Sequence, residues 1–279
     1  MPLLPTTNAD GQEVIPMTEA QKYLFDLKGF IALPGLVAEE ELQEIRAHQM
    51  KFLYERESLP ADERDHHGGP SQILLDHPAV VGVLNEILSY QALATEQCYG
   101  FRYDHTYTSH RESGHDNFSP HGGGGYFNFR GNSHIYQRQS GKIHSGLTRV
   151  VWELNEVAEG DGGTLFLPGS HKAAFPRPQE WSERDSPLWE SYACPAGSAV
   201  IFTEALCHSG TRWNNEQRDR LCLFTCYDTV NSKWGKGCPA PEVIASFPEK
   251  RRTLFRGVWH GMSEVPGINQ YYEESNKAV

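Results

Sequence analysis

The spacing of apolar residues predicts helices in the first ninety positions. Thr18 is followed three residues later by Gln21, as in a capping box, so we expect a short helix that ends near Asp26. Residues 37–53 combine acidic residues in the first turn with an apolar face at helical spacing. That face consists of Leu42, Ile45, Met50 and Leu53. Residues 78–89 form a third expected helix, which is apolar enough that we expect it to pack against a sheet.

After about residue 97 the pattern changes to short apolar runs separated by Gly, Asn and Pro, which is typical of a β-barrel or β-sandwich. The clearest candidate strands are 147–154, 164–167, 199–202 and 221–227. A turn is expected at Gly160–Gly163. We therefore predict a mainly β fold with flanking helices, organised as a single domain over 1–279. Its parts are a helical flank over 17–90, a β core over 97–230 and a C-terminal extension over 239–279.

Composition narrows the classes of function. The chain of 279 residues is 38% hydrophobic, and its 25 basic and 36 acidic residues give a formal charge of −11 without basic clusters, which argues against nucleic-acid binding. The six cysteines form no CxxC pair and are expected to be reduced thiols. The N-terminus lacks signal-peptide features, and no apolar run approaches the length of about 18 residues that a membrane span needs. We expect a soluble, cytoplasmic protein with a small-molecule partner and no membrane partner.

Histidines are the strongest chemical signal. Six of the thirteen histidines fall between residues 105 and 144, and imidazole is the commonest neutral metal ligand. His121 directly precedes four glycines, which indicates either a metal ligand beside a space kept empty or a flexible glycine loop with an incidental histidine. His208 follows the predicted strand 199–202 and precedes Arg218 and Arg220, which supports the metal interpretation of both histidines.

Four parts of the chain together resemble the phytanoyl-CoA dioxygenase family, a branch of the Fe(II)/2-oxoglutarate oxygenases. They are 29–37 with the acidic helix that follows, 151–155 with 162–172 and its string Pro-Gly-Ser-His-Lys, 197–202 leading to His208, and Arg220 twelve residues later. The resemblance covers roughly 24–230. It implies a double-stranded β-helix (a cupin-like jelly-roll) with N-terminal helices, Fe(II) bound by His121 and His208, and 2-oxoglutarate and O₂ as co-substrates.

The resemblance also implies that Arg220 pairs with the far carboxylate of 2-oxoglutarate, for which an arginine fork provides two charge-assisted hydrogen bonds. Arg218 is the second choice, because two residues along a strand return to the same face. His171, within Pro-Gly-Ser-His-Lys, is structural and turn-associated in the family.

The chain departs from the family at the metal-binding carboxylate. The family motif is His-x-Asp, whereas this chain reads His121-Gly122-Gly123. Three explanations remain open: a remote acid supplies the oxygen, water or chloride fills the position beside Gly123 as in the iron halogenases, or the site has lost its catalytic competence. The nearest acids in sequence are Asp104, Glu112 and Asp116.

His134 is a rival for the first histidine ligand. We prefer His121, because Tyr136 would occupy the space that Gly123 leaves open. Residues that are candidates for lining a substrate cavity are Arg102, Tyr126, Arg130, His134, Tyr136 and Trp213.

The leading hypothesis is an oxidoreductase that attacks an unactivated C–H bond of a small organic metabolite, with hydroxylation as the default outcome. The first alternative is a halogenase that uses chloride beside Gly123. The second alternative is a non-catalytic jelly-roll that binds a small acidic metabolite.

Overall fold

The computed structural model describes residues 4–123, 131–139 and 141–258. They form two compact units, each built from segments that are distant in sequence. The first unit contains the described residues of Met1–Met17, Glu44–Tyr107 and Thr225–Val279, and the second contains those of Thr18–Gln43 and Thr108–Phe224. The predicted Tyr126 and Arg130 lie outside the described residues.

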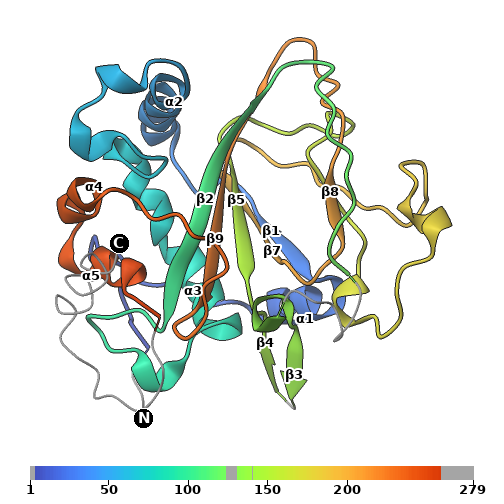
Figure 1. The fold of residues 1–279 in the computed structure, drawn as a ribbon, viewed down its shortest axis with the longest axis horizontal. Helices are drawn as coiled ribbons and strands as arrows, with labels where there is room; N and C mark the ends of the chain where they lie inside the picture. Colours follow the sequence, from blue (N-terminus) through green and yellow to red (C-terminus); the bar gives the residue numbers. More distant parts are fainter. Residues whose placement is uncertain (1–3, 124–130, 140, 259–279) are drawn as a thin grey trace. The chain divides into compact units, whose positions relative to one another are not determined.

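A five-stranded sheet has the order β1-β7-β5-β9-β2, and Figure 1 labels its strands. Its strands are β1 (Phe30–Leu33), β2 (Phe101–Arg111), β5 (Thr148–Glu153), β7 (Ser198–Thr203) and β9 (Arg220–Thr229). Strands β6 (Thr164–Phe166) and β8 (His208–Gly210) form a second antiparallel sheet, and β3 (Gln137–Gln139) pairs with β4 (Lys142–His144). The four strands expected from apolar runs are confirmed as β5, β6, β7 and β9. The described strands form no closed barrel.

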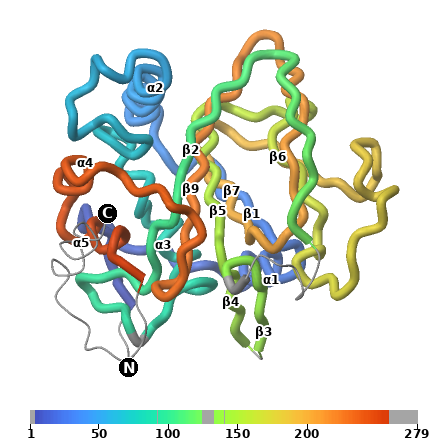
Figure 2. Tube along the Cα trace, in the orientation of Figure 1, coloured from blue at the N-terminus to red at the C-terminus, as the bar shows by residue number. Residues whose placement is uncertain are grey.

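Aromatic rings link β6 to β1 and β7 of the five-stranded sheet. Figure 2 labels these three strands along the Cα trace. Phe166 of β6 stacks on Phe30 of β1 with ring centroids 4.4 Å apart, and meets Phe202 of β7 at 5.0 Å. These rings are buried together with Val151 and Phe224. Burial of large aromatic side chains is a major stabilising contribution, so this core fixes the β6–β8 pair against the larger sheet.

Helix α1 (Glu19–Lys28) confirms the predicted capping box, because Thr18 accepts a hydrogen bond from the Gln21 backbone N–H and the Gln21 side chain accepts one from Thr18. The helix ends at Gly29, whose φ of 85° is left-handed. A Cβ atom at this position would lie 2.6 Å from Nδ1 of His171. Glycine is therefore needed here both for the left-handed φ and for the close approach of the His171 ring.

Helix α2 (Glu39–Tyr54) buries only part of the predicted face. Leu42 and Ile45 are buried as expected, but Met50 is 36% exposed. Polar residues take the inner positions, because Gln49 donates hydrogen bonds to the His66 carbonyl at 2.6 Å and to the Ser71 hydroxyl at 2.8 Å. Hydrogen bonding makes the burial of polar groups acceptable, and apolar spacing alone does not reveal it.

Helices α3 (Pro78–Ile87), α4 (Pro241–Ser246) and α5 (Glu249–Arg252) belong to the first unit. Short 3₁₀ helices connect the elements of the chain at Arg56–Ser58, Ala61–Glu63, Gly69–Leu75, Gln91–Leu93, Gly131–His134, Ser170–Lys172, Gln179–Ser182 and Thr253–Phe255.

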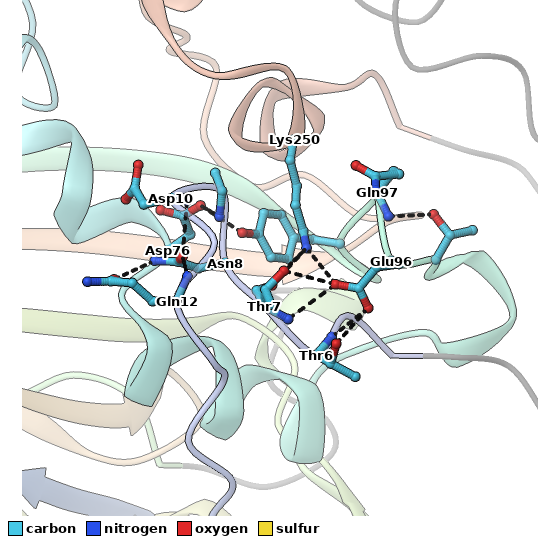
Figure 3. A network of polar contacts seen from close by, with 12 residues as sticks. Thr6, Thr7, Asn8, Asp10, Gln12, Asp76, Glu96, Gln97 and Lys250 are labelled. Carbon is cyan, nitrogen blue, oxygen red and sulfur yellow. Dashed lines mark hydrogen bonds and ion pairs between the residues drawn. The ribbon is translucent and has the colours of Figure 1, made fainter.

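Side chains from α5 hold the N-terminal segment in place (Figure 3). Lys250 donates to the Thr7 carbonyl at 2.7 Å and reaches Glu96 at 3.3 Å. Glu96 in turn accepts hydrogen bonds from the backbone N–H groups of Thr6 and Thr7. A C-terminal region with little sequence periodicity therefore has a structural role.

Buried His67 makes the stability of the first unit pH-dependent. It is fully buried, with Nε2 2.9 Å from the Thr225 hydroxyl, and burial lowers its pKa to about 3. The unfolded chain takes up a proton near pH 6.5 and the folded protein only near pH 3, so stability is lost as the pH falls through this window. This group alone should lower the free energy of unfolding by about 3 kcal/mol between pH 7 and pH 4.

Urea unfolding at both pH values, for the wild type and His67→Gln, measures this effect. The variant should lose less stability on acidification than the wild type. Equal losses in the two proteins would contradict the prediction.

Candidate metal centre

Three side chains of the second unit bring together atoms that are able to bind a metal. They are the imidazoles of His121 and His208 and the carboxylate of Glu204, whose ligand atoms all lie within 4.8 Å of one another. The two imidazole centroids are 4.2 Å apart, and Nε2 of His208 is 3.6 Å from Oε2 of Glu204. Two imidazoles and one carboxylate form the ligand set of the non-haem Fe(II) oxygenases.

Strand pairing and a tight turn position these residues. His208 begins β8, and its backbone forms an isolated bridge with His121, with N–H···O distances of 3.0 and 2.9 Å. Directly opposite residues in a bridge project to the same side, which brings the two rings together. Glu204 follows the end of β7, and the turn closes with a 2.9 Å hydrogen bond from the Leu206 N–H to the Thr203 carbonyl.

Backbone carbonyls fix the tautomers of both histidines. Nδ1 of His121 is 2.8 Å from the Ser119 carbonyl oxygen, and Nδ1 of His208 is 2.8 Å from that of Leu206. A carbonyl oxygen only accepts hydrogen bonds, so each Nδ1 carries the proton and donates it. Each Nε2 is left with a lone pair for a metal, an arrangement that is typical of histidine ligands.

The electrostatics favour the metal-binding protonation states of Glu204 and His208. Burial acts to raise the pKa of Glu204, but Arg149, His208 and His134 together lower it to about 2. Burial lowers the pKa of His208 to about 4. At neutral pH the carboxylate is therefore ionised and the imidazole is neutral, which is the state that metal binding requires.

Gly123 directs its missing side chain toward packed atoms. It has a left-handed φ of 57°, and a Cβ atom there would lie 2.8 Å from Cβ of Cys207 and 3.1 Å from Cβ of Ser170. In this conformation a side chain at position 123 would point toward Cys207 and Ser170, and no atom of His121, Glu204 or His208 is among the three atoms nearest to its Cβ.

The acid in the group is one that the sequence reasoning overlooked. Glu204 stands four residues before His208, and this Glu-x-x-x-His spacing was the available signal. None of the three acids considered from the sequence belongs to the group. Asp104 accepts hydrogen bonds from the backbone of the first unit, Glu112 is exposed, and Asp116 pairs with Arg184.

Arg220, the residue expected to bind 2-oxoglutarate, begins β9 and is 1% exposed. Its Nε donates to Oε2 of Glu153 at 3.2 Å, and Nη2 contacts the other Glu153 oxygen and the Tyr192 hydroxyl. Nη1 is buried without a hydrogen-bond partner among the described residues. A buried unsatisfied donor is costly, so an anionic ligand at Nη1 would be stabilised. Arg218 precedes the strand and pairs with Glu156 and Asp161.

Three of the residues predicted to line a cavity have structural partners. Arg102 donates to the Arg256 carbonyl, the Tyr136 hydroxyl donates to Asp26, and buried Trp213 donates to the Arg218 carbonyl. His134 is also buried and, through its effect on the pKa of Glu204, lies in the electrostatic surroundings of the metal ligands.

His171 packs its ring edge-on against Tyr136, with centroids 4.5 Å apart, next to Gly29. It is not part of the metal-binding group.

A β6–β8 pair packed on a larger sheet, together with a group of two histidines and one carboxylate, is typical of non-haem metal enzymes with a jelly-roll core. The chain belongs to the phytanoyl-CoA dioxygenase (PhyH) family, whose model matches residues 25–222. The matched region contains His121, Glu204, His208 and Arg220.

Solved structures share the fold at low sequence identity. HygX from Streptomyces hygroscopicus, with nickel and 2-oxoglutarate bound, is 21% identical with a TM-score of 0.61, covering 78% of this chain and 88% of HygX. SnoK, a non-haem α-ketoglutarate-dependent carbocyclase from nogalamycin biosynthesis, is 16% identical with a TM-score of 0.55, covering 92% of this chain and 97% of SnoK. AviO1 from Streptomyces viridochromogenes Tue57 is 12% identical with a TM-score of 0.55, covering 80% of this chain and 99% of AviO1. These similarities confirm the predicted jelly-roll fold.

A comparison with curated proteins gives no match. Among the described residues, no helix has both the length and the apolar character needed to cross a membrane.

Proposed function

We propose that the protein is an Fe(II)/2-oxoglutarate-dependent oxygenase that hydroxylates an unactivated C–H bond of a small organic metabolite. The observation that carries the proposal is the convergence of His121, Glu204 and His208 within 4.8 Å, with each imidazole held in the tautomer that a metal needs. Membership of the PhyH family and the 2-oxoglutarate bound in HygX support the same assignment.

The residues have separate roles in this proposal. His121, Glu204 and His208 hold Fe(II), which when bound supplies the activation of O₂. The far carboxylate of 2-oxoglutarate binds Nη1 of Arg220, the buried donor without a partner among the described residues. The Phe202 ring, whose centroid is 4.7 Å from that of His208, shields one side of the His208 imidazole from water.

A cavity of about 720 Å³ in the second unit supports the proposal that the substrate is a small molecule, because its volume is typical of small-molecule sites. Its lining is mostly apolar, and it includes Gly123, which is two residues from His121, and Arg177. We propose that it accepts a substrate with an apolar body.

Hydroxylation is proposed over halogenation because of Glu204. A halide needs a coordination position from which the protein carboxylate is missing, whereas here a carboxylate from another part of the chain stands beside both histidines. In this proposal, the lack of an acid at Gly123 is compensated by Glu204.

An anaerobic optical titration with Fe(II) and 2-oxoglutarate, with and without chloride, tests the proposal. We expect the metal-to-keto-acid charge-transfer band to appear and to be unaffected by chloride. A chloride-dependent band or tighter 2-oxoglutarate binding in chloride would favour the halogenase. If no band appears under any condition, the oxygenase proposal is wrong and the alternative of a non-catalytic protein that binds a small acidic metabolite is favoured.

Replacing His208 by alanine should abolish the band and the retention of iron after mild chelation, because one of the two imidazole ligands is lost. His144→Ala is the matched control, since this histidine of the second unit is not part of the metal-binding group. An H208A protein that retained iron like the wild type would contradict the assignment of this ligand.

A further inference from the structure

The two carboxylate oxygens of Glu204 face different partners. Oε1 forms a close ion pair with Nε of Arg149, while Oε2 lies 3.6 Å from Nε2 of His208. The carboxylate is thus held between a guanidinium on one side and the metal-binding imidazole on the other.

Strand pairing positions the two backbone segments that carry Arg149 and Glu204. Arg149 lies on β5 directly opposite Phe202 of β7, and Thr148 lies opposite Thr203, the residue before Glu204. The Glu204 N–H also donates to the Leu147 carbonyl at 2.8 Å. Both side chains are largely buried, with exposed fractions of 11% for Arg149 and 4% for Glu204. The orientation of the carboxylate is therefore built into the pairing of β5 and β7.

We propose that Arg149 is a positioning residue that restricts Glu204 to a single metal-binding oxygen. The inference rests on the proposed function, because it concerns the same metal centre. A carboxylate is able to bind a metal through one oxygen or both. Three single-atom protein ligands leave open positions for a chelating keto acid and O₂. Because Arg149 occupies Oε1, only Oε2 is available, and the position that a second oxygen would fill remains open for the keto acid.

Replacing Arg149 by methionine separates this role from a purely structural one. In Arg149→Met, both Glu204 oxygens become available and the nearby positive charge is gone, so metal affinity should stay within about threefold of the wild type. The 2-oxoglutarate concentration needed for half of the charge-transfer band should rise on the order of tenfold, because a second carboxylate oxygen would compete for the position that the keto acid needs.

The measurements are an anaerobic titration with Co(II), followed by its visible absorption, and a titration of the Fe(II) protein with 2-oxoglutarate. Thermal unfolding with and without Co(II) gives a third readout. Without Arg149 the buried Glu204 charge lacks this counter-charge, so R149M should unfold at a lower temperature than the wild type. Because stabilisation by a bound metal depends on its affinity, Co(II) should raise the unfolding midpoints of both proteins by similar amounts.

Two variants provide controls. Arg149→Lys keeps a cation beside Oε1 and should bind 2-oxoglutarate more tightly than R149M. Arg184→Met removes another paired arginine of the second unit, whose ion pair with Asp116 involves none of the metal ligands, and should behave like the wild type.

R149M that loses metal and 2-oxoglutarate together, or that binds both like the wild type, would overturn the positioning role. If R149M does not fold, Arg149→Gln takes its place, and identical 2-oxoglutarate binding by R149Q and R149K would overturn the role equally. A wild-type protein that binds no metal would instead overturn the proposed function, and the inference with it.

Discussion

Replacing Glu204 by glutamine is expected to weaken metal binding by on the order of 100-fold or more, because the only anionic member of the group is lost. Glutamine has nearly the same shape and keeps an oxygen that is able to accept a hydrogen bond from Arg149, so the fold should survive. Titration with Co(II) under anaerobic conditions measures the loss. Retention of wild-type affinity by E204Q would show that the third ligand comes from another residue.

A second variant tests whether an acid at position 123, where the family motif has one, is able to replace Glu204. Gly123→Asp in the E204Q background should not restore metal binding, because a side chain at position 123 points toward Cys207 and Ser170. The left-handed φ of Gly123 adds strain to any such substitution. Restored binding in the double variant would mean that the His-x-Asp geometry is still accessible and that Glu204 is dispensable.

Replacing Arg251 by methionine is expected to lower the free energy of unfolding by about 3–5 kcal/mol, the usual cost of breaking a buried ion pair by removing one partner. Arg251 is 1% exposed and binds Asp76, which is fully buried, with Nε 2.8 Å from Oδ1. It also donates to Gln72 at 2.8 Å and pairs with Asp10. The substitution would leave Asp76 without its cation.

Denaturant unfolding of R251M and the wild type measures this loss. Arg252→Met is the control, because Arg252 is only half-buried and donates through Nε to the Phe247 carbonyl. Its effect should be below about 1 kcal/mol. Equal losses in the two variants would contradict the assignment of the stabilisation to the buried pair.

Local sequence patterns predicted the elements of the chain well. The Thr18–Gln21 capping box and the strands β5 and β7 depend on neighbouring residues, so they are readable without tertiary information. The buried face of α2 was less predictable, because Gln49 is buried through hydrogen bonds to residues 17 and 22 positions away. Periodicity identifies apolar residues but not the partners that make a polar residue suitable for the interior.

In the candidate site, too, features that depend on neighbouring residues were predictable and features that depend on distant residues were not. His121 and His208 were proposed as ligands because each stands in a local string that resembles the family, and the structure brings their side chains together. Glu204 was missed because its role depends on the turn after β7 and on the backbone bridge between His208 and His121. The pairing of Arg220 with Glu153 joins residues 67 positions apart and was likewise not visible.

Motifs and periodicity within short segments were enough to predict the family, the jelly-roll class and the two candidate histidine ligands. Three features became visible only in the folded chain: the acid that stands beside those histidines, the direction of the side chain missing at Gly123, and the Arg220 donor that is left for a ligand. These features depend on side chains that strand pairing brings together from distant positions. The physical reason is that ligand geometry and hydrogen-bond partners are properties of space, whereas the sequence pattern records only order along the chain.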